Sequence, residues 1–179
     1  MLKSPPQVQA QLAEALTLIS ESDFPKQWPD LLPQLVGQLK ENVADYSVLY
    51  GALTSANSIF KRFRHGEILA GDLNDELRLC QESFGGPLLE ISRAVTAQVE
   101  SDPNPSKATL EYPLRCARLA FRIWFSLNYF GLSELEFEML PEFMKIFDFY
   151  LTFENAALSQ EADAEQESLL DGVKSAVCR

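Results

Sequence analysis

The sequence has few of the residues that catalysis and metal binding need. Its 179 residues include one histidine, His65, and three cysteines. The cysteines, Cys80, Cys116 and Cys178, lie far apart and form no CxxC pair, so they predict neither a disulfide framework nor a zinc site. A general base needs an orienting partner and a pocket, and the residues around His65 supply no such motif. We therefore expect no enzyme, no cofactor and no metal.

Positive charge is also scarce, with 15 lysines and arginines against 26 acidic residues and a formal net charge of −11. Nucleic-acid affinity comes largely from basic side chains that displace counterions, so we expect no nucleic-acid partner. No apolar run approaches the roughly 20 residues of a membrane span, so we expect no membrane insertion. A basic protein surface would complement this charge best.

Signals for strands and for phosphate-binding loops are missing as well. No Asn-Gly or Asp-Gly pair joins two alternating apolar runs, which predicts almost no strand. The run Gly85-Gly86-Pro87 lacks both the GxGxxG spacing and a preceding strand, so it predicts a kink in a helix rather than a nucleotide site.

What remains is helical periodicity, in a chain that is 46% hydrophobic. Apolar residues recur every three or four positions almost throughout, as on the buried side of amphipathic helices. In the first helix they form one stripe: Val8, Leu12, Ala15, Leu16 and Ile19. The fold class is therefore predicted to be all-α, with helices over 5–22, 29–42, 45–63, 72–100, 107–130, 133–153 and 169–177.

Particular residues shape these helices. Pro113 is expected to bend or restart its helix. Ser133 and Glu136 have capping-box spacing at a helix start. Glu134, Glu136 and Glu138, two residues apart, are predicted to form a solvated face, and the aromatic run over 121–130 to form core between repeats. The acidic stretch 159–167 is predicted to be a loop.

The helices fall into pairs whose starts are roughly 40 and 60 residues apart, which fits HEAT or armadillo repeats with one insertion. We predict a single solenoid segment over 1–179, an all-α HEAT-repeat α-solenoid. Such pairs bury their apolar sides only by stacking, so the ends of the array should expose apolar faces and favour self-association. The abrupt C-terminus favours a piece of a longer array. The predicted units are repeats over 5–42, 45–100 and 107–153 and a partial repeat over 165–179.

Three stretches carry a family resemblance. The first, SESDFPKQWPDLLPQLVGQLK, is similar to the repeat signature of the importin-β (karyopherin-β) superfamily. The second stretch consists of ANSIFKRFRHGE followed by LNDELRLCQESFGGPLLEI, and the third is FSLNYFGLSELEFEML. Both resemble the nuclear export receptors of that superfamily that return importin-α to the cytoplasm. The resemblance covers most of the chain, in order.

The resemblance implies a non-catalytic scaffold that shuttles between nucleus and cytoplasm. Its implied partners are RanGTP and importin-α, engaged by the full-length receptor, and it also allows nucleoporins. The chain would correspond to an N-terminal region that lacks the first one or two repeats. The alternatives are another importin or a generic HEAT assembly scaffold.

Basic residues gather at two places in this acidic chain. Lys61, Arg62 and Arg64 end the third predicted helix, where positive charge also suits the helix dipole. The second group is Arg115, Arg118 and Arg122, on the helix predicted over 107–130. These arginines recur at helical spacing and therefore share one face of the helix, which would point toward an adjacent repeat or a partner. The resemblance adds exposed polar positions on the second helix of each pair, which line the concave surface. The candidate partner-binding residues are Lys61, Arg62, Arg64, Arg78, Arg115, Arg118 and Arg122.

Overall fold

The computed structural model describes residues 6–64, 72–101, 105–155, 158 and 168–179. These residues contain no strand, and the predicted all-α class is confirmed. His65 and the predicted loop over 159–167 lie outside the described residues. The helices, in chain order, are α1 (Pro6–Asp23), α2 (Leu31–Glu41), α3 (Tyr46–Phe60) with a 3₁₀ turn η1 (Lys61–Arg64), α4 (Asp72–Ser101), α5 (Lys107–Asn128), α6 (Glu134–Thr152) and α8 (Leu169–Val177).

Four helices begin at a side chain that caps them. Asp45, Ser106, Ser133 and Ser168 each accept a hydrogen bond from a backbone amide in the first turn of α3, α5, α6 and α8, respectively. Each cap satisfies a donor that the helix leaves unpaired and contributes about 1 kcal/mol. The capping role predicted for Ser133 is confirmed, since its hydroxyl accepts from the amide of Glu136.

The prolines within α4 and α5 do not end these helices. Helix α4 runs without interruption through Gly85, Gly86 and Pro87, and α5 runs through Pro113 without a restart. Pro113 is buried in the core, so packing offsets the backbone hydrogen bond that a proline removes. Helices α4 and α5 are therefore continuous over 30 and 22 residues, and the bends predicted at Pro87 and Pro113 stay predictions.

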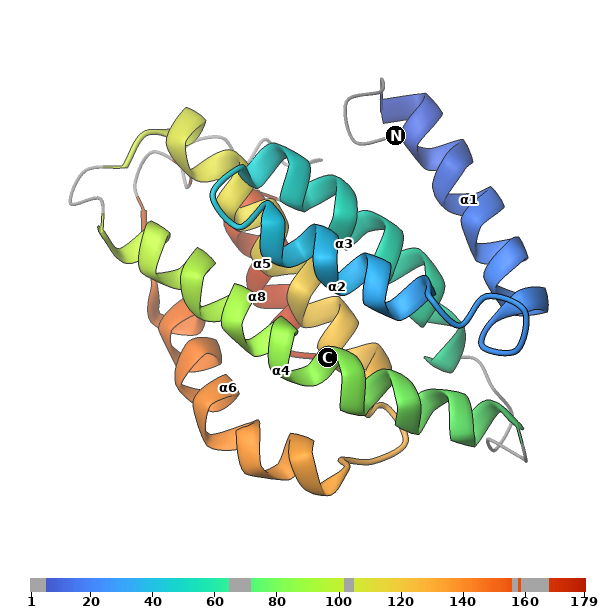
Figure 1. Ribbon diagram of the computed structural model, residues 1–179. Coiled ribbons are helices and arrows are strands. Elements are labelled where there is room, and N and C mark those ends of the chain that lie inside the picture. Colours follow the sequence, from blue (N-terminus) through green and yellow to red (C-terminus); the bar gives the residue numbers. More distant parts are fainter. Residues whose placement is uncertain (1–5, 65–71, 102–104, 156–157, 159–167) are drawn as a thin grey trace.

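The helices form two layers (Figure 1). Helices α1, α3, α5 and α8 lie side by side in sequence order in one layer, and α2, α4 and α6 form the second layer. Helix α4 packs on α5 and so joins the layers near the middle of the array. This alternation of first and second helices is the arrangement of a HEAT-type solenoid.

The core between the layers is rich in aromatic side chains. Phe60 of α3 meets Phe84 of α4 edge to face, with ring centroids 4.9 Å apart. Phe121 of α5 lies between Phe147 and Tyr150 of α6, at 5.1 and 5.3 Å. Such edge-to-face pairs add to the free energy gained from burial alone. The aromatic run on α5 thus supplies core up to its last turn, as predicted.

The last two residues of the aromatic run are not part of the core, so the prediction is wrong for them. Tyr129 and Phe130 are 50% and 45% exposed, because α5 ends at Asn128 and the chain turns away through Gly131. Gly131 has a φ of +144°, a backbone conformation that favours glycine. The two rings therefore lie on the surface between α5 and α6.

Most of the predicted apolar stripe of α1 is exposed, although its member Leu16 packs against the core. Val8, Leu12 and Ile19 of that stripe are 40%, 39% and 48% exposed. The buried side instead carries Thr17, whose hydroxyl donates to the carbonyl of Ser58 in α3 at 3.0 Å. At the other end of the array, α6 exposes a second apolar row: Phe137, Met144 and Leu151. Apolar side chains are thus exposed on α1 and α6, and the coverage of these faces by adjacent repeats stays a prediction.

Candidate partner-binding surfaces

The basic cluster at the end of α3 divides into different environments. Arg62 forms an ion pair with Glu76 of α4 at 2.8 Å, and both side chains are largely buried. Arg64 is half-buried with its guanidinium 6.0 Å from the ring centroid of Phe125, while Lys61 is exposed. Arg62 therefore ties η1 to α4, and Lys61 has the most open access to a partner.

The three arginines of α5 lie together, as their spacing predicted. Arg115, Arg118 and Arg122 line a cleft of about 330 Å³ between α3, α5 and α8, which we call the arginine cleft. Its other lining residues are Tyr50, Leu114, Leu119 and Leu169.

Contacts within the cleft hold the arginines in place. Arg115 pairs with Glu111 one turn earlier at 2.8 Å, and its guanidinium lies 5.9 Å from the ring centroid of Tyr50. Arg118 rests against α8, where a Cβ on Gly172 would lie 2.9 Å from Nη1. Gly172 therefore provides the space that lets Arg118 pass between α5 and α8.

Arg122 of the arginine cleft interacts electrostatically with Arg64. Burial lowers the pKa of Arg64, and the positive charges of Arg122 and Arg179 lower it further. Sequence reasoning did not include Arg179, because nothing in the local pattern connects it with residues more than fifty positions earlier.

A second concavity lies in the layer of α2, α4 and α6. The groove between the start of α4 and the turn before α6, which we call the α4–α6 groove, has a volume of about 560 Å³ and includes the predicted residue Arg78. Gln81 holds it in shape by donating to the carbonyls of Leu127 and Gly131, at 2.8 and 3.2 Å. Acidic and apolar side chains complete the lining: Glu82, Glu134, Phe130, Leu132 and Leu135.

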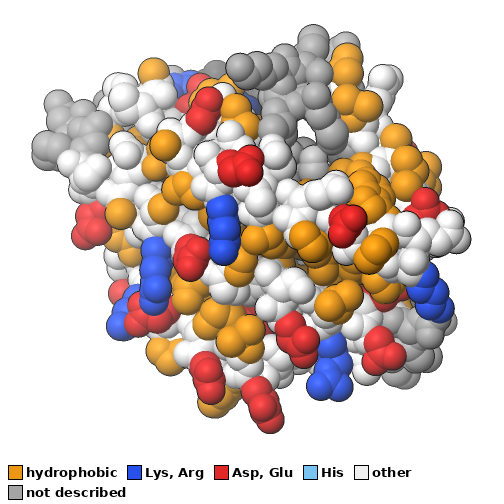
Figure 2. Space-filling model, viewed as in Figure 1, with side chains coloured by type: hydrophobic (Ala, Val, Ile, Leu, Met, Phe, Trp, Pro, Cys, Tyr) orange, Lys and Arg blue, Asp and Glu red, His pale blue; other side chains and the backbone are white. Residues whose placement is uncertain are grey.

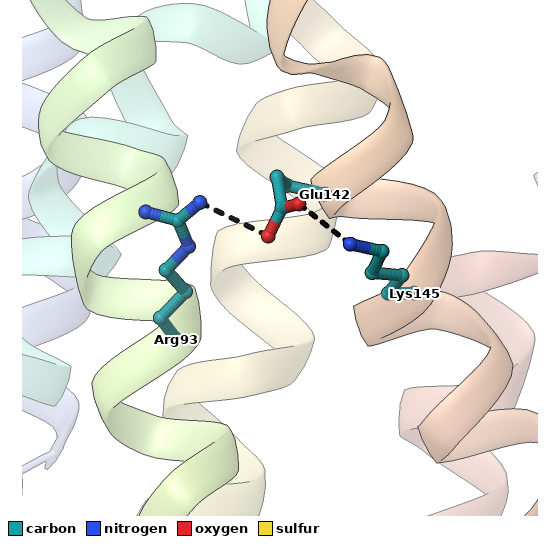
Figure 3. Close-up of polar contacts among 3 residues, drawn as sticks. All are labelled: Arg93, Glu142 and Lys145. Atoms are coloured by element: carbon teal, nitrogen blue, oxygen red, sulfur yellow. Dashed lines mark hydrogen bonds and ion pairs between the residues drawn. The ribbon is translucent and has the colours of Figure 1, made fainter.

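The surface around this layer mixes both signs of charge with apolar side chains (Figure 2). Figure 3 shows one example, in which Glu142 of α6 accepts from Arg93 of α4 at 3.0 Å and from Lys145 at 2.8 Å. The hydrogen bonds from Lys145 and Arg93 hold the pKa of Glu142 below its usual range. Exposed pairs of this kind contribute little stability, and the Arg93–Glu142 pair adds one polar contact between α4 and α6.

Glu136 contradicts the predicted solvated acidic face. Glu134 and Glu138 are exposed, but the side chain of Glu136 is fully buried against α4, where a Cβ on Gly85 would lie 2.5 Å from Oε1. Neither carboxyl oxygen makes a hydrogen bond of good geometry. Burial therefore raises the pKa of Glu136 to about 7, and the nearby Asn128 and Trp124 side chains offset only part of that rise.

The sequence did contain a signal for this burial. Glu136 lies seven and fourteen residues before Phe143 and Tyr150, so the three share one row of the helix. Phe143 and Tyr150 are 0% exposed. The row next to it, which contains Phe137, is the exposed one.

Comparison with known proteins identifies the family. A model of the Cse1 family matches residues 59–179, more than half of the chain. The chain belongs to the Cse1 family. It is 34% identical over 178 residues to exportin-2 of Xenopus laevis and of Homo sapiens, matches that cover 99% of this chain and 18% of each relative. The chain thus spans about a fifth of the length of these relatives.

A solved Cse1 structure has the same fold. It is the exportin Cse1 in its cargo-free, cytoplasmic state, with a TM-score of 0.88 and 31% identity, over 98% of this chain and 18% of that one. The chain is therefore a segment of an exportin-2-like nuclear transport receptor built from HEAT repeats. Exportins are transport receptors without catalytic activity, which agrees with the prediction of a scaffold rather than an enzyme.

No helix in the described part of the chain combines the length and apolar character needed to cross a membrane. Within residues 6–64, 72–101, 105–155, 158 and 168–179, no three histidine, cysteine or carboxylate side chains gather as metal ligands.

Proposed function

We propose that this chain is the part of a nuclear export receptor that contacts RanGTP and helps to return importin-α to the cytoplasm. The observation that carries the proposal is the match to exportin-2 along 99% of the chain, together with the shared fold. Such a receptor shuttles between nucleus and cytoplasm. The full-length receptor supplies the rest of the partner contacts, because the chain covers 18% of its relatives.

We place the contact with RanGTP on the layer of α2, α4 and α6, which are the second helices of the predicted pairs. Solenoids bind through the extended surface that one set of helices lines. The α4–α6 groove is the larger of the two concavities described above, and it presents the cation Arg78 beside the exposed Leu132 and Leu135. A protein partner could fill it with an apolar side chain and place a carboxylate on Arg78.

The test compares variants of a full-length receptor that contains this segment. The double substitution Arg78→Glu and Leu135→Glu should weaken capture of GTP-locked Ran at least tenfold. The matched control is Lys107→Glu, an exposed charge change at the first residue of α5. Twenty residues of helix, about 30 Å, separate that position from Leu127 at the groove. Equal capture by both variants would remove the groove from the Ran-binding surface.

A further inference from the structure

Three arginines line one cleft in a chain whose net charge is −11. They are Arg115, Arg118 and Arg122. Arg122 also interacts electrostatically with Arg64, which in turn interacts with Arg179. We propose that the arginine cleft binds an extended acidic peptide segment of a partner protein.

The length of the cation row selects the ligand. Arg115 and Arg122 are seven residues apart on α5, which is about 10 Å along the helix axis. Carboxylates on successive side chains of an extended peptide can follow such a row, and each can pair with one guanidinium group.

The walls of the cleft favour a peptide over a simple anion. Leu114, Leu119 and Leu169 place apolar surface between the cations, and Tyr50 closes the α3 side. Ion pairs beside apolar surface are screened less by water than ion pairs on an open face. A segment that alternates acidic and apolar residues matches this lining better than a run of acids alone.

Repulsion between neighbouring arginines favours binding of an anionic ligand. The depressed pKa of Arg64 records repulsion from Arg122 and Arg179 as well as burial. A bound carboxylate relieves that repulsion. Arg118 and Arg122 make polar contacts within the chain, and Arg115 is paired with Glu111. Each guanidinium has five donors, so it can contact a ligand as well as a partner within the chain. At Arg115 the ligand competes with Glu111.

The position of the cleft separates it from the proposed Ran contact. All of its lining residues belong to α3, α5 and α8, whereas the α4–α6 groove lies in the second layer. An acidic peptide bound in the cleft would therefore leave the groove free. Acidic residues elsewhere on the chain repel such a peptide, so binding should be confined to this surface.

The experiment measures binding of a fluorescent peptide, four repeats of Glu-Leu, to the 179-residue chain by anisotropy. The double variant Arg118→Gln and Arg122→Gln should bind at least tenfold more weakly, because each lost charge-assisted contact accounts for about that factor. The matched control is Arg93→Gln, an exposed arginine on α4, which should bind as the parent does. Circular dichroism checks that all three proteins are folded.

Two competition arms define the ligand. Inorganic phosphate at tenfold higher concentration should not displace the peptide, and a Lys-Leu peptide of equal length should not bind. Equal affinities for the double variant and the Arg93 variant would overturn the proposal, and so would displacement by phosphate. The result is independent of Ran capture by the full receptor, because the peptide assay uses this chain alone.

Discussion

Replacement of the buried carboxyl Glu136 by its neutral isostere should change how stability depends on pH. The side chain is 0% exposed and packs on Gly85, so Glu136→Gln removes the charge with little change in shape.

The sign follows from the two pKa values. The folded-state pKa is raised to about 7 from 4.5, so the folded protein holds a proton that the unfolded chain releases. Between pH 4.5 and 7 the free energy of unfolding therefore falls as pH rises, and above 7 the loss is complete. A rise of this size corresponds to roughly 3 kcal/mol. Relative to the parent, Glu136→Gln should gain about 2 to 3 kcal/mol between pH 5 and pH 8.

Urea unfolding at pH 5 and at pH 8, followed by circular dichroism, measures this gain. The matched control is Glu138→Gln, two residues away on the exposed side of α6, for which the difference from the parent should be nearly independent of pH. The reasoning is refuted if the stability difference between Glu136→Gln and the parent is the same at both pH values.

Three further changes test the packing. Gly85→Ala places a methyl group 2.5 Å from Oε1 of Glu136, so the melting temperature should fall by several degrees, whereas Gly86→Ala, with open space at its Cβ, should not lower it. Asp45→Ala removes the cap of α3 and should lower the free energy of unfolding in urea by about 1 kcal/mol. A decrease below about 0.3 kcal/mol would argue against a stabilising cap. Met144→Glu charges the exposed row of α6 and should reduce concentration-dependent association in sedimentation velocity; unchanged association would assign it to another surface.

Much of the fold follows from local sequence signals. Asp45 and Ser133 cap helices because their side chains reach amides a few residues ahead, and such contacts depend on nearby residues alone. The all-α class follows similarly from apolar periodicity. The shared face of Arg115, Arg118 and Arg122 is a consequence of helical spacing, and the structure brings them together in one cleft.

What sequence could not supply depends on which neighbour each helix meets. Both rows of α6 read as apolar, yet Phe143 is buried and Met144 is 54% exposed, because the first row faces α4 and α5. The same uncertainty hid the burial of Glu136 and the exposure of the apolar stripe on α1. The electrostatic interaction of Arg179 with Arg64 likewise depends on tertiary structure, since Arg179 follows α8, which packs on α5.

The central claim is that this chain acts as part of an export receptor for importin-α. The most direct measurement replaces the matching segment of Homo sapiens exportin-2 with this chain and captures GTP-locked or GDP-bound Ran, with and without importin-α. The account predicts that the chimera prefers GTP-locked Ran and binds it more tightly when importin-α is present. Equal capture of both forms of Ran, by a chimera that circular dichroism shows to be folded, would contradict it.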